Sequence, residues 1–347
     1  PIWGYSTTNT PGSATLPGPV LVGNQNETLE VILHNNLSEA TSLNFPGSTL
    51  VPDTVGAAAG ADITYTFSLN DPGTFLYEAG LTDNGGVQVA MGMFGALVVR
   101  PASNASWAYD RADTAFDAEE LLVLSEIDPD LNNNPAGFDM RYYKPKFWLV
   151  NGQTFPDVGS VLVNKGNAVL LRYLNGGLLD HSIGVLGLNQ TVMATDGNLL
   201  TYPYRVNSET IVAGQSLDVM LSIPAAAPDG AKYPVYDAGF HIHNNGQTST
   251  NGQVTLGGMF TYLMVPEAAP ASDLIGPVST ADVLPNLTNG LSDVTLTGTV
   301  SDVDSGNANV TDVEYFFDNL GADGTGTAVT SVSVRLKSKL ELPLSLG

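Results

Sequence analysis

The sequence predicts an all-β protein built from sandwich-type domains, and three observations support that prediction. Short apolar runs recur along the chain. They are separated by turn signals rich in glycine and proline, of which the chain has 37 and 21, and this alternation is typical of short strands joined by tight turns. Amphipathic helical patterns are nearly absent, apart from a short acidic turn expected at 113–120.

Each expected strand is a short apolar or alternating run that turn residues bound on both sides. In chain order the runs are TLEVILHNNL (28–37), DITYTFSL (62–69), TFLYEA (74–79), FGALVVRP (94–101), ELLVLSEI (120–127), AVLLRYLN (168–175), SIGVLGL (182–188), QTVMAT (190–195), SETIVA (208–213), LDVMLSI (217–223) and GGMFTYLMVP (257–266).

Two segments far apart in the chain end alike, which indicates duplication at the scale of a domain. MGMFGALVVRP (91–101) and LGGMFTYLMVP (256–266) both place glycine and Met-Phe before an apolar strand and a proline. Each also follows a strand with a tyrosine and a small-residue turn, FLYEAG (75–80) and YPVYDAG (233–239).

The duplication and the composition predict three regions. We expect a first domain at 1–102, a second domain at 103–268 whose first part, 103–114, is a linker, and a linker followed by a smaller, incomplete β unit at 269–347. The final stretch, 332–347, changes character and becomes basic and leucine-rich.

Charge and composition exclude several classes of function. The chain has 35 acidic and 12 basic residues and a net charge of −23, so nucleic acid and anionic lipid are poor partners. The chain has no run of about 18 apolar residues, so the sequence predicts no membrane span. The absence of cysteine excludes disulfides, thiol nucleophiles and thiolate metal sites. The chain starts at Pro1 without a signal-like segment, so export has to be argued by other means.

The stretch FHIHNNG (240–246) contains two of the four histidines of the chain. On a strand, His241 and His243 would point to the same side, which is the spacing of a metal-ligand pair. Two imidazoles alone hold a divalent ion weakly, so a working site would need a further ligand, with Asp237 and Glu78 as the carboxylates to consider. The alternative is that the pair is a remnant, hydrogen-bonded within the sandwich.

Residues 3–266 resemble the multicopper oxidases. The resemblance lies in the order and spacing of WGYS (3–6), LPGPVL (16–21), ETLEVILHNNL (27–37), PGTFLYEAG (72–80), QVAMGMFGALVVRP (88–101), WLVNGQTFPD (148–157), VLLRYLNGG (169–177), HSIGVLGL (181–188), ATDGN (194–198), GQSLDV (214–219) and GGMFTYLMV (257–265). It implies two cupredoxin-like Greek-key β-sandwiches. The unit that follows resembles a partial bacterial immunoglobulin-like β module.

The resemblance also implies copper ligands, most of which this chain lacks. The family holds a mononuclear copper with a cysteine, two histidines and often a methionine, and a trinuclear cluster with several His-x-His pairs. His181 and Met259 match mononuclear-copper positions, but Ile242 stands at the cysteine. Other residues replace the histidines of the pairs, namely Asn44, Pro46, Glu78, Gly80, Gly184 and Leu186.

Individual side chains carry further expectations. We expect His181 to be a buried, neutral histidine in an apolar pocket with Ile242 and Met259 rather than a ligand, and His34 to lie at the surface. A buried Glu78 should find a donor or have a raised pKa. Asp302 and Asp304, in DVDSGNAN (302–309), form either a calcium-binding turn or an ordinary Asx-rich turn.

The expected function is that of a copper-free multicopper-oxidase homologue, acting as a binding or structural protein, secreted or at the bacterial cell surface. Its partner would be a protein or polymer of the cell exterior, or a second copy of the chain. We expect neither a catalytic residue nor a resident cofactor. The alternative is an oxidoreductase of the multicopper oxidase type with one residual copper or other divalent ion at His241 and His243. For a hydrolase the sequence offers almost nothing.

Overall fold

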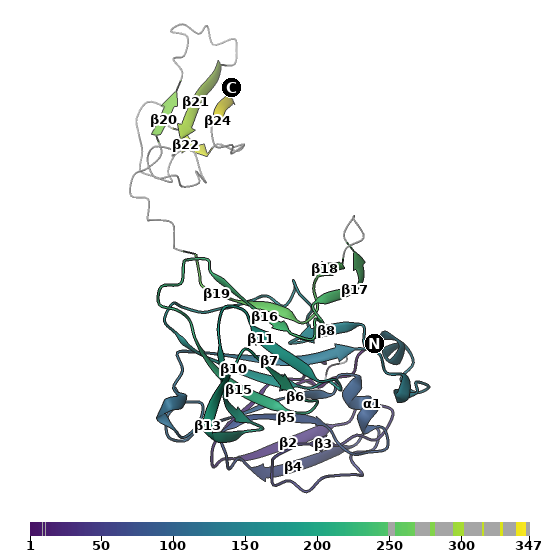
Figure 1. Ribbon diagram of the computed structural model, residues 1–347. Helices are drawn as coiled ribbons and strands as arrows, with labels where there is room; N and C mark the ends of the chain where they lie inside the picture. The colour runs from purple at the N-terminus through teal and green to yellow at the C-terminus, as the bar shows by residue number, and fades with distance from the viewer. Residues whose placement is uncertain are drawn as a thin grey trace. The chain divides into compact units, whose positions relative to one another are not determined.

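The computed structural model describes residues 1–248 apart from 9 and 11, residues 254–267, and five strands further along the chain. The chain divides into two compact units, Pro1–Pro266 and Glu267–Gly347. The first unit contains two β-sandwich domains in sequence, coloured purple to green in Figure 1. The all-β prediction is confirmed. None of the described helices is long and apolar enough to cross a membrane.

The first domain consists of two small sheets packed around an aromatic core. One sheet has the order β1-β6-β5-β3 and the other pairs β2 with β4. Tyr65 and Phe67 on β4 alternate with exposed residues and bury themselves against Phe45 and Tyr77, as expected for a strand with one face on the core. The elements are β1 Leu21–Asn24, β2 Thr28–His34, β3 Leu43–Asn44, β4 Asp62–Ser68, β5 Gly73–Ala79, the short helix α1 Gly85–Ala90 and β6 Phe94–Arg100.

The second domain is a larger sandwich. Its sheets have the orders β13-β12-β15-β10-β7-β8 and β14-β11-β16-β19-β9, and β17 and β18 form a separate two-stranded sheet. The elements are η1 Ala112–Thr114, β7 Ala118–Ile127, α2 Pro129–Asn133, η2 Met140–Tyr142, β8 Phe147–Val150, β9 Ser160–Leu162, β10 Ala168–Asn175, β11 His181–Val185, β12 Gln190–Thr195, β13 Asn198–Val206, β14 Ser208–Ile211, β15 Ser216–Ser222, β16 Lys232–Asp237, β17 His243–Thr248, β18 Val254–Leu256 and β19 Phe260–Met264.

The acidic turn expected at 113–120 is only partly present. A 3₁₀ helix occupies Ala112–Thr114, but strand β7 begins at Ala118 and pairs in parallel with β10. Glu119 is drawn into that sheet because it accepts hydrogen bonds from Arg100 and Arg172. A tertiary contact with two arginines therefore overrides the local acidic pattern.

A buried polar network joins the two sandwich domains. The Arg172 side chain is fully buried on β10, and its Nη1 donates to Asp218 Oδ2 at 2.8 Å and to Thr74 Oγ1 at 2.9 Å. Thr74 belongs to β5 of the first domain, and its hydroxyl donates to Asp218 Oδ1 at 2.7 Å. Ser216 Oγ on β15 donates to the Thr74 carbonyl. Because breaking a buried ion pair is costly, this network resists separation of the two domains.

The second unit is described only through its strands. They are β20 Val278–Ala281, β21 Val294–Ser301, β22 Glu314–Tyr315, β23 Thr327–Ala328 and β24 Ser338–Leu344. β21 pairs antiparallel with both β20 and β24, so part of the basic stretch 332–347 forms a strand. The calcium hypothesis at Asp302 and Asp304 lies outside the described residues. The domain boundaries and the immunoglobulin-like assignment stay predictions.

Candidate metal centre

A cluster of histidines and carboxylates lies between the two sheets of the second domain. His181 is the first residue of β11 and Asp237 the last residue of β16, and these strands pair with each other. Glu126 and Trp148 lie opposite each other on β7 and β8 of the other sheet. His241 comes just before β17. Strand ends from both sheets therefore meet at one site.

Both ring nitrogens of His181 contact a carboxylate. Nδ1 lies 3.2 Å from Asp237 Oδ2, and Nε2 lies 3.2 Å from Glu126 Oε2. The side chains of His181 and Glu126 are fully buried and that of Asp237 is 1% exposed. Two carboxylates can both accept only if both ring nitrogens carry a proton, so the geometry favours the imidazolium.

The neutral His181 expected from the sequence is therefore wrong. Burial alone lowers the pKa of His181, but the hydrogen bonds to Asp237 and Glu126 and the charges of these carboxylates outweigh burial and raise the pKa to about 9. Burial raises the pKa of Asp237, yet bonds from His181, the Gly239 N–H and His241 lower it overall. The pocket is an ion-paired site rather than an apolar one, because two acids face the ring.

The two histidines of the FHIHNNG stretch differ in their contacts. Both rings pack on Trp148, that of His241 stacked and that of His243 edge-on, each with its centroid 4.7 Å from the indole. Of the two, only His241 also contacts the carboxylate cluster, because its Nδ1 lies 2.6 Å from Asp237 Oδ2. Ligand atoms of His181, Asp237 and His241 all lie within 4.8 Å of one another. Among the described residues the candidate set therefore includes Asp237 and His181, and not His243.

Asp237 reaches this cluster because the duplicated segments differ in register. Glu78 lies opposite Phe94 in the first domain, whereas Tyr236 lies opposite the corresponding Phe260 in the second. A one-residue difference turns a side chain to the other face of a strand. Asp237 is thus buried, while Glu78 is half-buried.

The remaining candidate positions have other surroundings. Glu78 Oε1 accepts from Asn44 Nδ2 at 3.4 Å, so two positions that the resemblance aligns with copper ligands contact each other. Burial raises the pKa of Glu78 and outweighs the hydrogen bond from Asn44, which lowers it. Met259 is buried in the core of the second domain, and its N–H donates to the His241 carbonyl. His34 pairs with Asp62 at the surface, as expected of an exposed residue.

The donors present do not fit the copper centres that the family resemblance implies. A blue-copper centre needs a thiolate, and the chain has no cysteine. The trinuclear cluster needs several histidine pairs, but the chain has four histidines in all. A single divalent ion is a different case, since two imidazoles and a carboxylate make a reasonable donor set.

Sequence reasoning missed Glu126 and Trp148. A signal for Glu126 was available, because it stands at the end of the apolar run ELLVLSEI, where a carboxylate needs a buried partner. Its histidine partner, His181, lies 55 residues further along the chain, and no local pattern identifies it. Trp148 opens WLVNGQ, and its role against the histidines depends on the pairing of β7 with β8.

The fold and the site define a protein of two cupredoxin-type sandwiches, the second of which contains a histidine–carboxylate cluster. Two models of the multicopper oxidase family match residues 12–104 and 127–256. The chain belongs to the multicopper oxidase family.

Known relatives are distant and longer. Copper resistance protein A of Escherichia coli is 24% identical over 271 residues, which cover 64% of this chain and 43% of that protein. Multicopper oxidase MmcO of Mycobacterium tuberculosis is 24% identical over 239 residues, which cover 60% and 46%. The chain thus spans less than half the length of these relatives.

Solved structures show the same fold at low identity. The blue copper oxidase of Nitrosomonas europaea superposes with a TM-score of 0.62 at 20% identity and covers 72% of this chain and 77% of that one. A copper nitrite reductase of the same organism gives 0.59 at 21% identity, with 74% and 85% covered.

Proposed function

We propose that this chain is a copper-free member of the multicopper oxidase family that acts as a binding or structural protein rather than as an oxidase. The observation that carries the proposal is His181, which matches a mononuclear-copper position and is hydrogen-bonded on both nitrogens to Glu126 and Asp237. An imidazolium between two carboxylates offsets part of their negative charge in the place where the family binds a copper ion.

The residue types around this position support the same conclusion. Electron transfer through a blue-copper centre depends on a thiolate ligand, and the resemblance places Ile242 at that position. The positions of the histidine pairs carry Asn44 and Glu78, which bond to each other. The scaffold is thus retained while the residues for oxygen reduction are replaced.

We place the protein outside the cell, secreted or at the cell surface, with a protein or polymer as partner. This placement rests on the family and on the second unit, Glu267–Gly347. The net charge of −23 fits a soluble exterior protein and disfavours nucleic acid as a partner.

An oxygen-consumption assay tests the proposal. The full chain is loaded with copper, dialysed and mixed with a phenolic electron donor, beside a copper-binding laccase as positive control. We expect no oxygen uptake above that of free copper. Uptake that is stoichiometric with protein and abolished in His241→Ala protein would overturn the proposal.

The second candidate is a single divalent ion held by His181, Asp237 and His241, because their ligand atoms converge within 4.8 Å. Ligating imidazoles must be neutral, so an ion here would displace the proton from His181. The test is calorimetric titration with Zn²⁺ under metal-free conditions. One equivalent bound by wild-type and His243→Ala protein but not by His241→Ala protein would establish this candidate. Equal weak binding by all three would reject it.

A further inference from the structure

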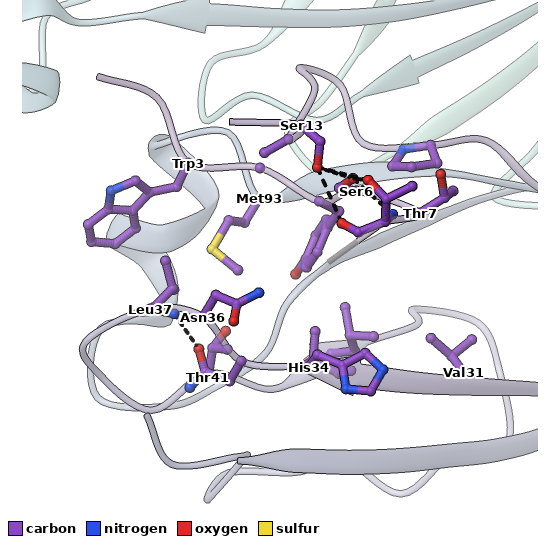
Figure 2. A pocket seen from close by; sticks show the side chains of 18 of the residues that line it. Trp3, Ser6, Thr7, Ser13, Val31, His34, Asn36, Leu37, Thr41 and Met93 are labelled. Atoms are coloured by element: carbon purple, nitrogen blue, oxygen red, sulfur yellow. Dashed lines mark hydrogen bonds between the residues drawn. The ribbon is translucent and has the colours of Figure 1, made fainter. Parts of the chain in front are cut away.

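One pocket of the first domain lies beside the N-terminal segment and has a volume of about 890 Å³. Figure 2 shows Ser6 and Ser13 on one side of it and His34 of β2 on the other. Ser6 Oγ lies 2.7 Å from Ser13 Oγ, and His34 pairs with Asp62. Each of these polar groups already has a partner within the chain, so they do not indicate a ligand.

A smaller pocket of the same domain has a volume of about 70 Å³. It lies between residues 45–49, the loop 69–71 that follows β4, and strands β5 and β6. Gly47, Asn70 and Asp71 are exposed, so the pocket is open to solvent. Its volume is several times the roughly 10–15 Å³ that one water needs and about half of the roughly 150 Å³ cavity that holds benzene. Its buried part therefore suits a compact group rather than a ring system.

Three phenylalanines line this pocket, namely Phe45 after β3, Phe67 on β4 and Phe75 on β5. The ring centroids of Phe45 and Phe67 lie 4.7 Å apart. Leu97 and Val99 of β6 also line the pocket, although they are only 3% and 1% exposed. The pocket thus reaches the core of the domain, where aromatic rings offer negative faces that attract a cation.

The Phe75 ring is held on one side and left uncovered on another. A Cβ at Gly197 would lie 2.3 Å from Phe75 Cε1, so the backbone of the turn between β12 and β13 packs directly on the ring. A Cβ at Gly47, which lines the pocket, would lie 3.4 Å from Phe75 Cδ1. Gly47 has a φ of +85°, which favours glycine, and it adds no side chain over the ring at this point.

The charge at the pocket is negative. Asp71 is the one charged residue among those that line it. The Asp71 carboxylate forms no ion pair or hydrogen bond with any residue in the described part of the chain, and residues 1–99 contain no lysine or arginine. A free carboxylate beside aromatic and aliphatic walls favours a cation whose charge is spread over methyl groups, because a strongly hydrated ammonium loses more water on entering.

We propose that this pocket binds a quaternary ammonium group, such as a trimethylammonium head group. The phenylalanine rings and the charge of Asp71 would attract the cation, and Leu97 and Val99 would contact its methyl groups. The pocket lies in the first domain and shares no residue with the histidine–carboxylate cluster of the second. The inference therefore goes beyond the proposed function and does not depend on it.

The test is a titration of the full chain, carrying labelled leucine and valine methyl groups, followed by NMR. The probe is choline chloride, and its neutral carbon isostere neohexanol is the matched control. We expect choline to shift the methyl signals of Leu69, Leu97 and Val99 saturably, with a Kd of about 10 mM or tighter. Neohexanol should bind at least about fivefold more weakly, and the signal of Leu171 in the second domain should not move.

Two variants separate the contributions of charge and ring. Asp71→Asn should weaken choline about threefold or more and leave neohexanol unchanged, whereas Asp83→Asn, at another exposed position of the domain, should bind choline as wild type does. Phe75→Leu keeps an apolar side chain but removes a ring, so it should weaken choline and not neohexanol. Should the Phe75 variant fail to fold, the Asp71 variant gives the same comparison at an exposed position.

Three results would overturn the proposal. The first is the absence of a saturable shift up to about 100 mM choline, and the second is equal affinity for choline and neohexanol. The third is an equal effect of Asp71→Asn and Asp83→Asn on choline binding. None of these results bears on the copper assay, so failure here is distinct from failure of the proposed function.

Discussion

Replacing His181 by glutamine removes the positive charge between two buried carboxylates. Stability is measured by urea unfolding, followed by tryptophan fluorescence, between pH 6 and 9.5 in the presence of EDTA. Glutamine retains a polar group at the site but cannot carry the charge that Glu126 and Asp237 stabilise.

The magnitude follows from the pKa of His181. A pKa raised from 6.5 to about 9 corresponds to about 3 kcal/mol of stabilisation by the protonated ring. Because the folded-state pKa lies above that of the unfolded chain, this contribution is complete below about pH 6.5 and disappears as the pH rises through about 9. The variant should thus be less stable by about 3 kcal/mol near pH 6, with the difference shrinking towards pH 9.5.

The matched control is His34→Gln. His34 is half exposed and pairs with exposed Asp62, a kind of pair worth less than about 1 kcal/mol. The other titrating groups, among them Tyr143, which donates to Glu126, are common to all the proteins compared. A loss in the His181 variant that does not change between pH 6 and 9.5, or that equals the loss in the control, would refute the charged histidine.

Three further substitutions, one of them with a matched control, test the packing that positions the site. Arg172→Met leaves Asp218 and Glu119 without their buried partner, so the free energy of unfolding should fall by about 3 to 5 kcal/mol; a loss below about 1 kcal/mol would contradict the interdomain network. Gly152→Ala puts a Cβ against the Leu16 carbonyl at a φ of +76°, and calorimetry should show a loss of about 2 kcal/mol or more, whereas an unchanged melting temperature would count against this contact. Leu171→Ala empties a fully buried core position and should cost about 2 to 5 kcal/mol in urea unfolding, while Leu162→Ala, at an exposed position, should stay within about 0.5 kcal/mol; similar losses in the two would contradict the assigned core.

The fold could be predicted from the sequence because its signals are local. Alternation such as that of DITYTFS over β4 and the repeated Met-Phe before β6 and β19 report strands and duplication directly. The site could be predicted only in part. The sequence suggests Asp237 and Glu78 as carboxylates beside His241 and His243, and the structure brings His241 and Asp237 together but places Glu78 beside Asn44.

The charge state of His181 could not be predicted from its neighbours in sequence. It depends on Glu126, which comes from the opposite sheet, and on the one-residue register difference that turns Asp237 inwards. The different contacts of His241 and His243 likewise depend on Trp148. Both rings pack on this indole, but only that of His241 lies beside Asp237. Such contacts are set by tertiary packing rather than by local pattern.

The central claim is most directly tested by the copper content of the loaded and dialysed protein. Mass spectrometry gives the ratio of copper to protein. His241→Ala/His243→Ala protein is treated in the same way. The account predicts far less than one copper per chain in both proteins. Near-stoichiometric copper in the wild type that the double variant loses would contradict it and establish a working metal site.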